Sequence, residues 1–211
     1  MTEAKKWNRQ PVERPRQITS AALEVFSRKG YRAATMQEIA EAAGITKGTI
    51  YLYFKSKTDL FVETIRTQFD EAIELVPQIN YEPGQDPEEL TRKVGRAFLD
   101  VLMTPKIAKV LPLVIAEYNH LPRLRTLYFE EVFSKADLHV ARLIDMGKSL
   151  GLVRDVNPEI AARCLLGAFF GIVLSQEVFG AKEYTPMDKD DIVSTIATVF
   201  FRGLATPEAL A

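Results

Sequence analysis

Hydroxyl, phenol and ammonium groups are concentrated in one short stretch of the sequence, ITKGTIYLYFKSK, which covers residues 45–57. Hydroxyls and amines donate hydrogen bonds to phosphate oxygens, lysine also reaches the O6 and N7 acceptors of guanine, and a phenol ring can contact a thymine methyl group. The sequence shows no paired nucleophile and base, no phosphate-binding loop and no set of metal ligands. It therefore indicates binding to nucleic acid rather than catalysis, and it predicts neither a metal nor a cofactor.

The charges of the chain are distributed unevenly. Residues 1–66 carry 12 Lys and Arg against 7 Asp and Glu, and the remaining residues carry 15 against 21, which together give the formal net charge of -1. A basic first segment favours a polyanionic partner for that segment only. Arg9, Arg14 and Arg16 lie in this segment, where they either enter a minor groove, as some N-terminal arms do, or form a solvated tail.

Helix signals bracket the polar stretch. Thr35 and Glu38 form a capping box that begins a helix over residues 36–43, and Gly44 ends this helix. The motif SKTD repeats the pattern directly after the stretch. About two turns of helix fit between the two boxes, since one turn takes about 3.6 residues. A short helix, a tight turn and a second short helix are the sequence form of a helix-turn-helix.

The residues TIYLYF within this stretch favour a strand by propensity alone, because they are β-branched and aromatic. A helix of two turns is too short to be stable by itself, so tertiary packing must hold it, and tertiary packing can override a strand preference. Ile50 and Phe54 fall on one edge of such a helix, where they can be buried against its neighbours. The other positions are left to make contacts outside the protein.

The exposed positions of this second helix suit a DNA duplex. Gly48 lets another molecule approach the backbone closely. Lys47 can reach a guanine edge or a phosphate, and Tyr51 can contact a thymine methyl group or a phosphate. Further donors that suit backbone phosphates are Thr49, Tyr53, Lys55 and Lys57. Lys57 also lies in the first turn of the following helix, whose N–H groups favour an anion.

The segment ITSAALEVFSRKGYRAATMQEIAEAAGITKGTIYLYFKSKTDLF, residues 18–61, resembles the N-terminal DNA-binding domain of the TetR family of transcriptional regulators. The later segments LVIAEYNHLPRLRTLYFEEVF and TVFFRGL are similar, more loosely, to the C-terminal domain of AcrR-like members. By position, the resemblance implies DNA contacts from Thr35, Gln37, Thr46, Lys47, Gly48, Thr49, Tyr51 and Tyr53, and it implies that Lys57 binds a phosphate. It also implies an all-α homodimer with a four-helix bundle formed by the last two long helices of each subunit. A small molecule bound in the body would alter the spacing of the two DNA-reading heads.

The rest of the sequence is also typical of helices. The first predicted helices cover residues 14–29, 36–43, about two turns after Thr46, and about 57–76, with an end near Val76. Two further helices start at Pro87 and near Pro105. The last three cover residues 122–150, 158–179 and 188–204. Pro112 removes a backbone donor and should kink or end the helix that contains it. No hairpin signal and no alternation of strands with helices is present. The predicted class is all-α with about nine helices, divided into an N-terminal arm and helix-turn-helix domain, 1–60, and an effector-binding and dimerisation domain, 61–211.

The helix predicted over residues 158–179 is apolar almost all round. Such a helix has core on every side, or core on one side and a partner on the other. Gly167 and Gly171 permit a close helix contact, either inside one subunit or between two, and a two-fold dimer is favoured because it matches a palindromic site. The expected dimer interface contains Leu165, Phe169, Ile172, Ile196 and Phe200. Phe98, Met103, Tyr118 and Phe129 could line a ligand cavity, although aromatic residues at helical spacing are more often simply core.

The leading interpretation is a dimeric repressor that a small, largely hydrophobic ligand releases from a palindromic operator. A helical DNA-binding protein without an effector is the alternative, and an enzyme ranks far behind both. The first residues lack the apolar core of a signal peptide, and the single cysteine, Cys164, rules out an intramolecular disulfide. The longest apolar run, residues 164–174, is shorter than the roughly 20 residues of a membrane span. We therefore expect a cytoplasmic protein with no membrane partner.

Overall fold

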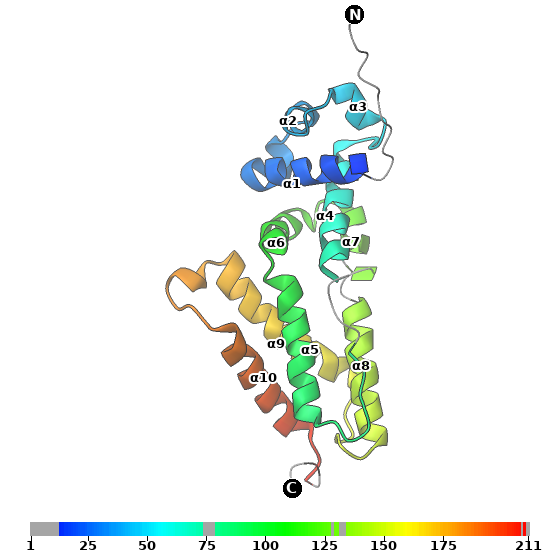
Figure 1. The fold of residues 1–211 in the computed structure, drawn as a ribbon, viewed down its shortest axis with the longest axis vertical. Helices are drawn as coiled ribbons and strands as arrows, with labels where there is room; N and C mark the ends of the chain where they lie inside the picture. The colour runs from blue at the N-terminus through cyan, green and yellow to red at the C-terminus, as the bar shows by residue number, and fades with distance from the viewer. Residues whose placement is uncertain (1–12, 74–78, 128, 131–133, 208, 210–211) are drawn as a thin grey trace, which may run out of the picture.

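The structure, a computed structural model, describes residues 13–73, 79–127, 129–130, 134–207 and 209. These residues form ten α-helices, and the only β pairing among them is an isolated antiparallel bridge between Val153 and Ala205 (Figure 1). The predicted all-α class is therefore confirmed, with ten α-helices where the sequence predicted about nine. Arg9 and the predicted helix end near Val76 lie outside the described residues.

Four helices form the end of the molecule that carries the polar stretch: α1 Glu13–Ala33, α2 Met36–Ala42, α3 Lys47–Tyr51 and α4 Lys57–Ile73. We call α1–α3 and the first turns of α4 the head, which lies at the top of Figure 1. Phe26 and Phe61 are fully buried at its centre, with ring centroids 5.0 Å apart in an edge-to-face arrangement. Ile18, Ile39 and Ile50 are fully buried in the same hydrophobic cluster, so residues from all four helices share one core.

The local signals of the head form as the sequence predicts. The Thr35 hydroxyl accepts the Glu38 N–H at 3.2 Å, and the Glu38 carboxylate accepts the Thr35 N–H at 3.0 Å, which is a complete capping box. Ser56 Oγ accepts the Asp59 N–H at 3.0 Å, so one half of the second predicted box is present. Gly30 interrupts α1 with φ 77°, a left-handed conformation that glycine adopts without steric penalty.

Six further helices form the body: α5 Pro87–Leu102, α6 Pro105–Glu117, α7 Pro122–Leu127, α8 Ser134–Ser149, α9 Pro158–Val173 and α10 Lys189–Leu204. Asp86 and Asn157 cap α5 and α9 as predicted, because each side chain accepts an N–H of the first helical turn and a proline follows it. α9 continues directly into a π-helical segment, Leu174–Val178. The helical path therefore ends close to the predicted position near residue 179.

Pro112 was predicted to kink or end the helix that contains it, and the helix does not end there. α6 continues past Pro112 to Glu117. Pro112 is exposed, so water can reach the carbonyl that loses its helical N–H partner, and the helix need not end there. Of the helix predicted over residues 122–150, the described residues contain α7 and α8, with Phe129 and Glu130 in a π-helical conformation between them. The Ser134 hydroxyl donates to the Phe129 carbonyl at 2.6 Å.

Charged side chains join the head to α6 and α7. Among the described residues, these ion pairs include Glu24 with Lys109, Arg32 with Glu117, and Asp59 with Arg123. A hydrogen bond from Arg123 lowers the pKa of Asp59 below its usual value of 3.8. Glu117 is buried, whereas Arg32 is largely exposed. Partly exposed pairs contribute little stability individually.

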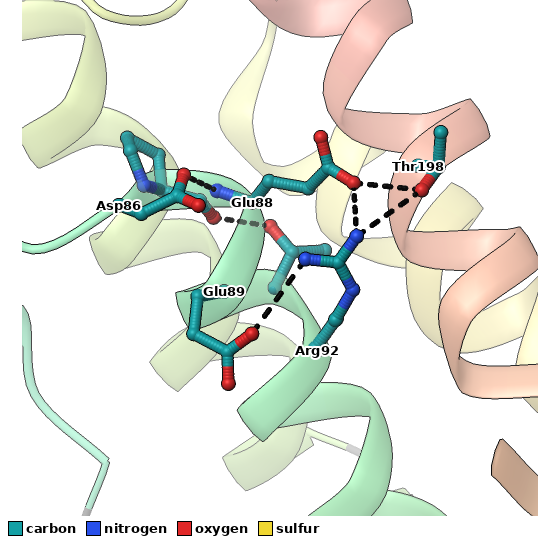
Figure 2. Close-up of polar contacts among 7 residues, drawn as sticks. Asp86, Glu88, Glu89, Arg92 and Thr198 are labelled. Carbon is teal, nitrogen blue, oxygen red and sulfur yellow. Dashed lines mark hydrogen bonds and ion pairs between the residues drawn. The ribbon is translucent and has the colours of Figure 1, made fainter.

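A polar seam joins α5 to α10 (Figure 2). Glu88 Oε1 accepts hydrogen bonds from Arg92 and, at 2.7 Å, from the Thr198 hydroxyl. Arg92 Nη2 also donates to Thr198 Oγ1 at 3.4 Å, which closes the network. Farther along the same two helices, Arg96 pairs with Asp190 at 2.6 Å. These contacts hold the last helix along the side of α5.

Candidate nucleic-acid interface

The second helix of the predicted helix-turn-helix, α3, is helical despite its strand-like residues. Thr46 is its N-cap and accepts the Thr49 N–H at 3.2 Å, and the two hydroxyl oxygens are 2.9 Å apart. Ile50 is fully buried and Phe54 is nearly so, which anchors the helix in the core of the head. Five helical residues have little stability of their own, so this anchoring decides the conformation.

The other side of α3 is presented to solvent. The exposed residues of α3 and of the two positions after it are Lys47, Gly48, Tyr51, Leu52 and Tyr53. Tyr51 is 47% exposed and Tyr53 is 40% exposed, a large aromatic surface for residues so close in sequence. α2 and α3 lie at the end of the molecule remote from the body (Figure 1), so the body leaves this surface open to a partner.

Gly48 has no structural reason to be glycine within this chain. Its φ is not among the positive values that favour glycine. A Cβ built on Gly48 would meet the Thr46 hydroxyl at 3.8 Å, an ordinary contact distance. Glycine in a helix is less stable than alanine by roughly 0.5–1 kcal/mol, so the protein gains no stability from it. Close approach of another molecule to the backbone at Gly48 stays a prediction.

The start of α2 lies at the same end of the head. Thr35 and Gln37, for which the resemblance implies DNA contacts, are both exposed. The Thr35 hydroxyl belongs to the capping box, and the Gln37 side-chain amide donates to Glu41 at 2.8 Å. Their contact with DNA stays a prediction.

The two lysines that follow α3 differ in their surroundings. Lys55 is exposed. Lys57 is half-buried, and its ammonium donates to the main-chain carbonyls of Arg32 at 3.0 Å and Ala34 at 2.9 Å. The predicted phosphate ligand therefore has partners within the head, which sequence reasoning missed because these carbonyls are more than 20 residues away.

A carboxylate links the end of α1 to the start of α2. Side-chain hydrogen bonds from Lys29 and then Thr35 lower the pKa of Glu38 from 4.5 to about 2. The capping box and the ion pair with Lys29 thus depend on the charged form of Glu38.

We expect Glu38 to titrate with a pKa of about 2, measured by NMR at its side-chain carboxyl carbon. Because the folded-state pKa lies below the unfolded value, this interaction stabilises the head above about pH 4.5 and is lost as the pH falls toward about 2. Lys29→Met should raise the pKa of Glu38, since its hydrogen bond is the largest cause of the shift. Lys106→Met removes a lysine that pairs with Glu71 and should leave it unchanged. A wild-type value near 4.5 would contradict this account.

The predicted dimer residues are placed differently from the expectation. Leu165 and Phe169 lie in the core of the single chain, so they leave no surface for a second chain. Ile172, Ile196 and Phe200 are partly buried. The exposed residues of α9 and α10 include Ile160, Cys164, Gly167, Ala168, Gly171, Val199 and Gly203. The spacing of Gly167 and Gly171 was the sequence signal for this exposed face.

The four predicted ligand residues do not line the apolar cavity of the described body. The Phe98 ring packs 6.4 Å from that of Phe169, Met103 and Tyr118 are half-buried, and Phe129 is 53% exposed. The cavity lies at the end of the body remote from the head, among α5, α8, α9 and α10. Its lining includes Leu90, Val94, Leu143, Ile144, Phe200 and Leu204. A ligand site at the four predicted residues stays a prediction.

Comparison with known proteins assigns both parts of the chain to one family. Residues 18–64 match the bacterial regulatory proteins of the tetR family, and residues 89–204 match the C-terminal domain of AefR-like transcriptional repressors. The chain is 27% identical to the HTH-type transcriptional regulator YhgD of Bacillus subtilis over 92% of this chain and 98% of that one.

Solved structures share the fold. A TetR-family transcriptional regulator from Mesorhizobium loti superposes with a TM-score of 0.77 at 22% identity, over 94% of this chain and all of that one. The flavonoid-responsive regulator FrrA superposes with a TM-score of 0.72 at 22% identity, over 92% of this chain and 98% of that one. The C-terminal match alone covers more than half of the chain, which confirms the resemblance noted in the sequence. The chain therefore belongs to the TetR family of DNA-binding transcriptional regulators.

Proposed function

We propose that the protein is a repressor whose head places α3 in the major groove of an operator. The exposed face of α3 supports this, because Gly48 leaves the backbone open between Lys47 and Tyr51. Lys47 and Tyr51 supply base-edge contacts, which set sequence preference. The phosphate and supporting contacts are proposed for Thr35, Gln37, Thr46, Thr49, Tyr53 and Lys55.

We propose that α9 and α10 form a homodimer interface through their exposed faces. A Cβ built on Gly167, Gly171 or Gly203 would meet nothing within 4 Å, so these positions are open to a partner helix. Val199 is 70% exposed on α10 and adds apolar surface. A two-fold dimer would place the two copies of α3 about 34–36 Å apart, which matches successive major grooves of a palindromic operator.

The apolar surface of α9 also has a membrane interpretation. The segment Pro158–Val178 is long and apolar enough, with a mean hydropathy of 1.5, to cross a bilayer by composition. A partner helix pair accounts for the same surface and agrees with membership of a family of DNA-binding regulators. We therefore propose a cytoplasmic dimer.

Gly171→Leu should weaken dimerisation by at least about tenfold, because the new side chain prevents close approach of two α9 helices. It should leave the fold of the single chain intact, since nothing lies within 4 Å of the added Cβ. Sedimentation equilibrium over a concentration series measures the change, with Ala116→Leu on the exposed side of α6 as the control. A Gly171→Leu protein that dimerises like the wild type would exclude this interface.

We propose that a small, uncharged, largely hydrophobic molecule releases the repressor from DNA. The cavity at the far end of the body supports this class of ligand, because its lining has no charged residue. One structural neighbour, FrrA, is described as flavonoid-responsive, which supports an aromatic or similarly apolar effector. α10 lines the cavity and also carries the proposed dimer face, so a ligand there could move one subunit relative to the other.

Selection of bound sequences from a random DNA pool tests the function. We expect a two-fold symmetric motif, and a hydrophobic ligand that raises the melting temperature should release the protein from that motif. A symmetric motif without any releasing ligand would favour the alternative, a DNA-binding protein with no small-molecule effector. Failure to enrich any sequence would refute the proposed operator.

A further inference from the structure

The apolar cavity at the far end of the body is smaller than the ligands proposed for it. It encloses about 70 Å³. An apolar cavity that binds benzene has about 150 Å³, and pockets for larger molecules have about 300–1,000 Å³. A wall of the cavity must therefore move before an uncharged ring compound can be bound there, and the hydrogen bonds of each wall indicate which one moves.

One non-helical wall of the cavity, formed by Leu152 and Val153, is firmly fastened. The N–H groups of both residues donate to the Gly147 carbonyl, at 2.9 and 3.2 Å. The Leu152 carbonyl accepts the Thr206 N–H at 3.1 Å, which ties this wall to the chain after α10. Moving the wall would break these hydrogen bonds, so this side of the cavity is held shut.

A second non-helical wall is the segment of residues 79–85, which we call the strap and which leads to the start of α5 (Figure 1). Its Tyr81 lines the cavity. Within the described part of the chain, the main chain of the strap makes one hydrogen bond outside itself, in which Nε2 of His139 on α8 donates to the Ile79 carbonyl at 2.8 Å. The Ile79 side chain also packs against the core. The strap is therefore held by fewer hydrogen bonds than the first wall.

The remainder of the strap is a turn that holds its own shape. Pro83 and Gly84 occupy its two central positions, and Gly84 has φ 84°, as the third residue of a type II turn requires. The Gln85 N–H donates to the Glu82 carbonyl at 2.9 Å, and the Gln85 side-chain oxygen accepts the Glu82 N–H at 3.3 Å. Because these bonds lie inside the strap, it can swing away from the body without losing them.

We propose that the strap is the entrance of the cavity, with Tyr81 as its movable wall and His139 as its latch. When the strap swings outward, the Tyr81 ring leaves the lining, and the cavity gains both an opening and the volume that a ring compound needs. This role of the strap rests on the ligand site proposed above and adds the movement by which that site is filled.

Movement of the strap can reach the proposed dimer face through α5. The strap continues into α5, whose Glu88 accepts a hydrogen bond from the Thr198 hydroxyl on α10 at 2.7 Å (Figure 2). Val199, the next residue of α10, is exposed on that face. A ligand that holds the strap open would therefore act on the helix that we propose to join the two subunits.

The labelling rate of a buried thiol measures opening of the strap in the ligand-free protein. Val94 is buried and lines the cavity from α5, so Val94→Cys in a Cys164→Ser background reacts with a soluble aromatic disulfide reagent when a wall opens. We expect His139→Ala to raise this rate about fivefold, because it removes one hydrogen bond of ordinary net strength. His139→Gln, which keeps an N–H donor, should label at nearly the rate of the protein with His139.

A buried thiol in another helix is the matched control. Val114→Cys, buried in α6, reports opening of the body as a whole, and His139→Ala should leave its labelling rate unchanged. Equal acceleration of both thiols, or no acceleration of either, overturns the strap as the movable wall.

Binding of N-phenylnaphthylamine, an uncharged ring compound whose fluorescence rises in apolar surroundings, tests the entrance. In stopped-flow mixing we expect its association rate to be about fivefold higher for His139→Ala than for the wild type. An equal association rate overturns the entrance. Faster labelling of Val94→Cys in a protein that binds neither this probe nor any releasing ligand would support the movable strap and refute the ligand site of the proposed function.

Discussion

Gly48→Leu should weaken specific DNA binding by roughly 100-fold and leave the folded protein at least as stable as the wild type. The free protein has room for the side chain, since the nearest atom to a Cβ at this position is 3.8 Å away. Leucine also favours helix over glycine by up to about 1 kcal/mol. In the complex, the new side chain would hold α3 away from the groove and withdraw Lys47 and Tyr51 from the base edges. Each good base contact is worth about 1–3 kcal/mol, so losing two accounts for the expected effect.

Fluorescence anisotropy with a selected operator and thermal unfolding, measured on the same samples, check this expectation. Ala116→Leu adds apolar bulk to an exposed position of α6 and should change neither quantity appreciably. Unaltered operator affinity in Gly48→Leu would show that another face of the head meets the DNA. A loss of both thermal stability and DNA binding would show that the substitution disrupts the fold of the head.

The elements of the head were predictable because their signals are local. The Thr35 and Glu38 side chains satisfy N–H groups within four residues of chain, so a capping box can be recognised without the rest of the structure. The helical conformation of α3 was harder to predict, because its residues favour a strand. It could still be predicted, since Ile50 and Phe54 have the spacing that one buried helical edge requires.

Contacts between distant residues could not be predicted in the same way. Lys57 donates hydrogen bonds to the carbonyls of Arg32 and Ala34, and nothing in the intervening sequence sets that approach. α9 presented a different difficulty, because a helix that is apolar all round carries no periodic signal for its core face. Leu165 and Phe169 therefore looked equivalent to exposed positions, and only packing against the rest of the body distinguishes them.

Gly95→Ala should lower the stability of the body by about 1–3 kcal/mol, which is the usual range for overpacking a core. A Cβ on Gly95 would lie 2.2 Å from Cζ of Phe169, far inside contact distance, and the ring is fully buried and cannot turn into solvent. The added atom must therefore separate α5 from α9. Arg96, the next residue of α5, pairs with Asp190 on α10, so this separation also strains the polar seam. We expect the melting temperature to fall by roughly 2–4 °C for each kcal/mol lost.

A double-mutant cycle connects this effect to the ring of Phe169. Phe169→Leu alone should be destabilising, because it leaves a cavity, but in its presence Gly95→Ala should lose much of its effect. Gly48→Ala is the matched control, since its Cβ meets only an ordinary contact at 3.8 Å. Additive effects of the two core substitutions would show that α5 and α9 can move apart without resistance from the ring. A coupling of 1 kcal/mol or more, on the order measured for contacting residues, would show that Gly95 is glycine because Phe169 occupies the space of its missing side chain.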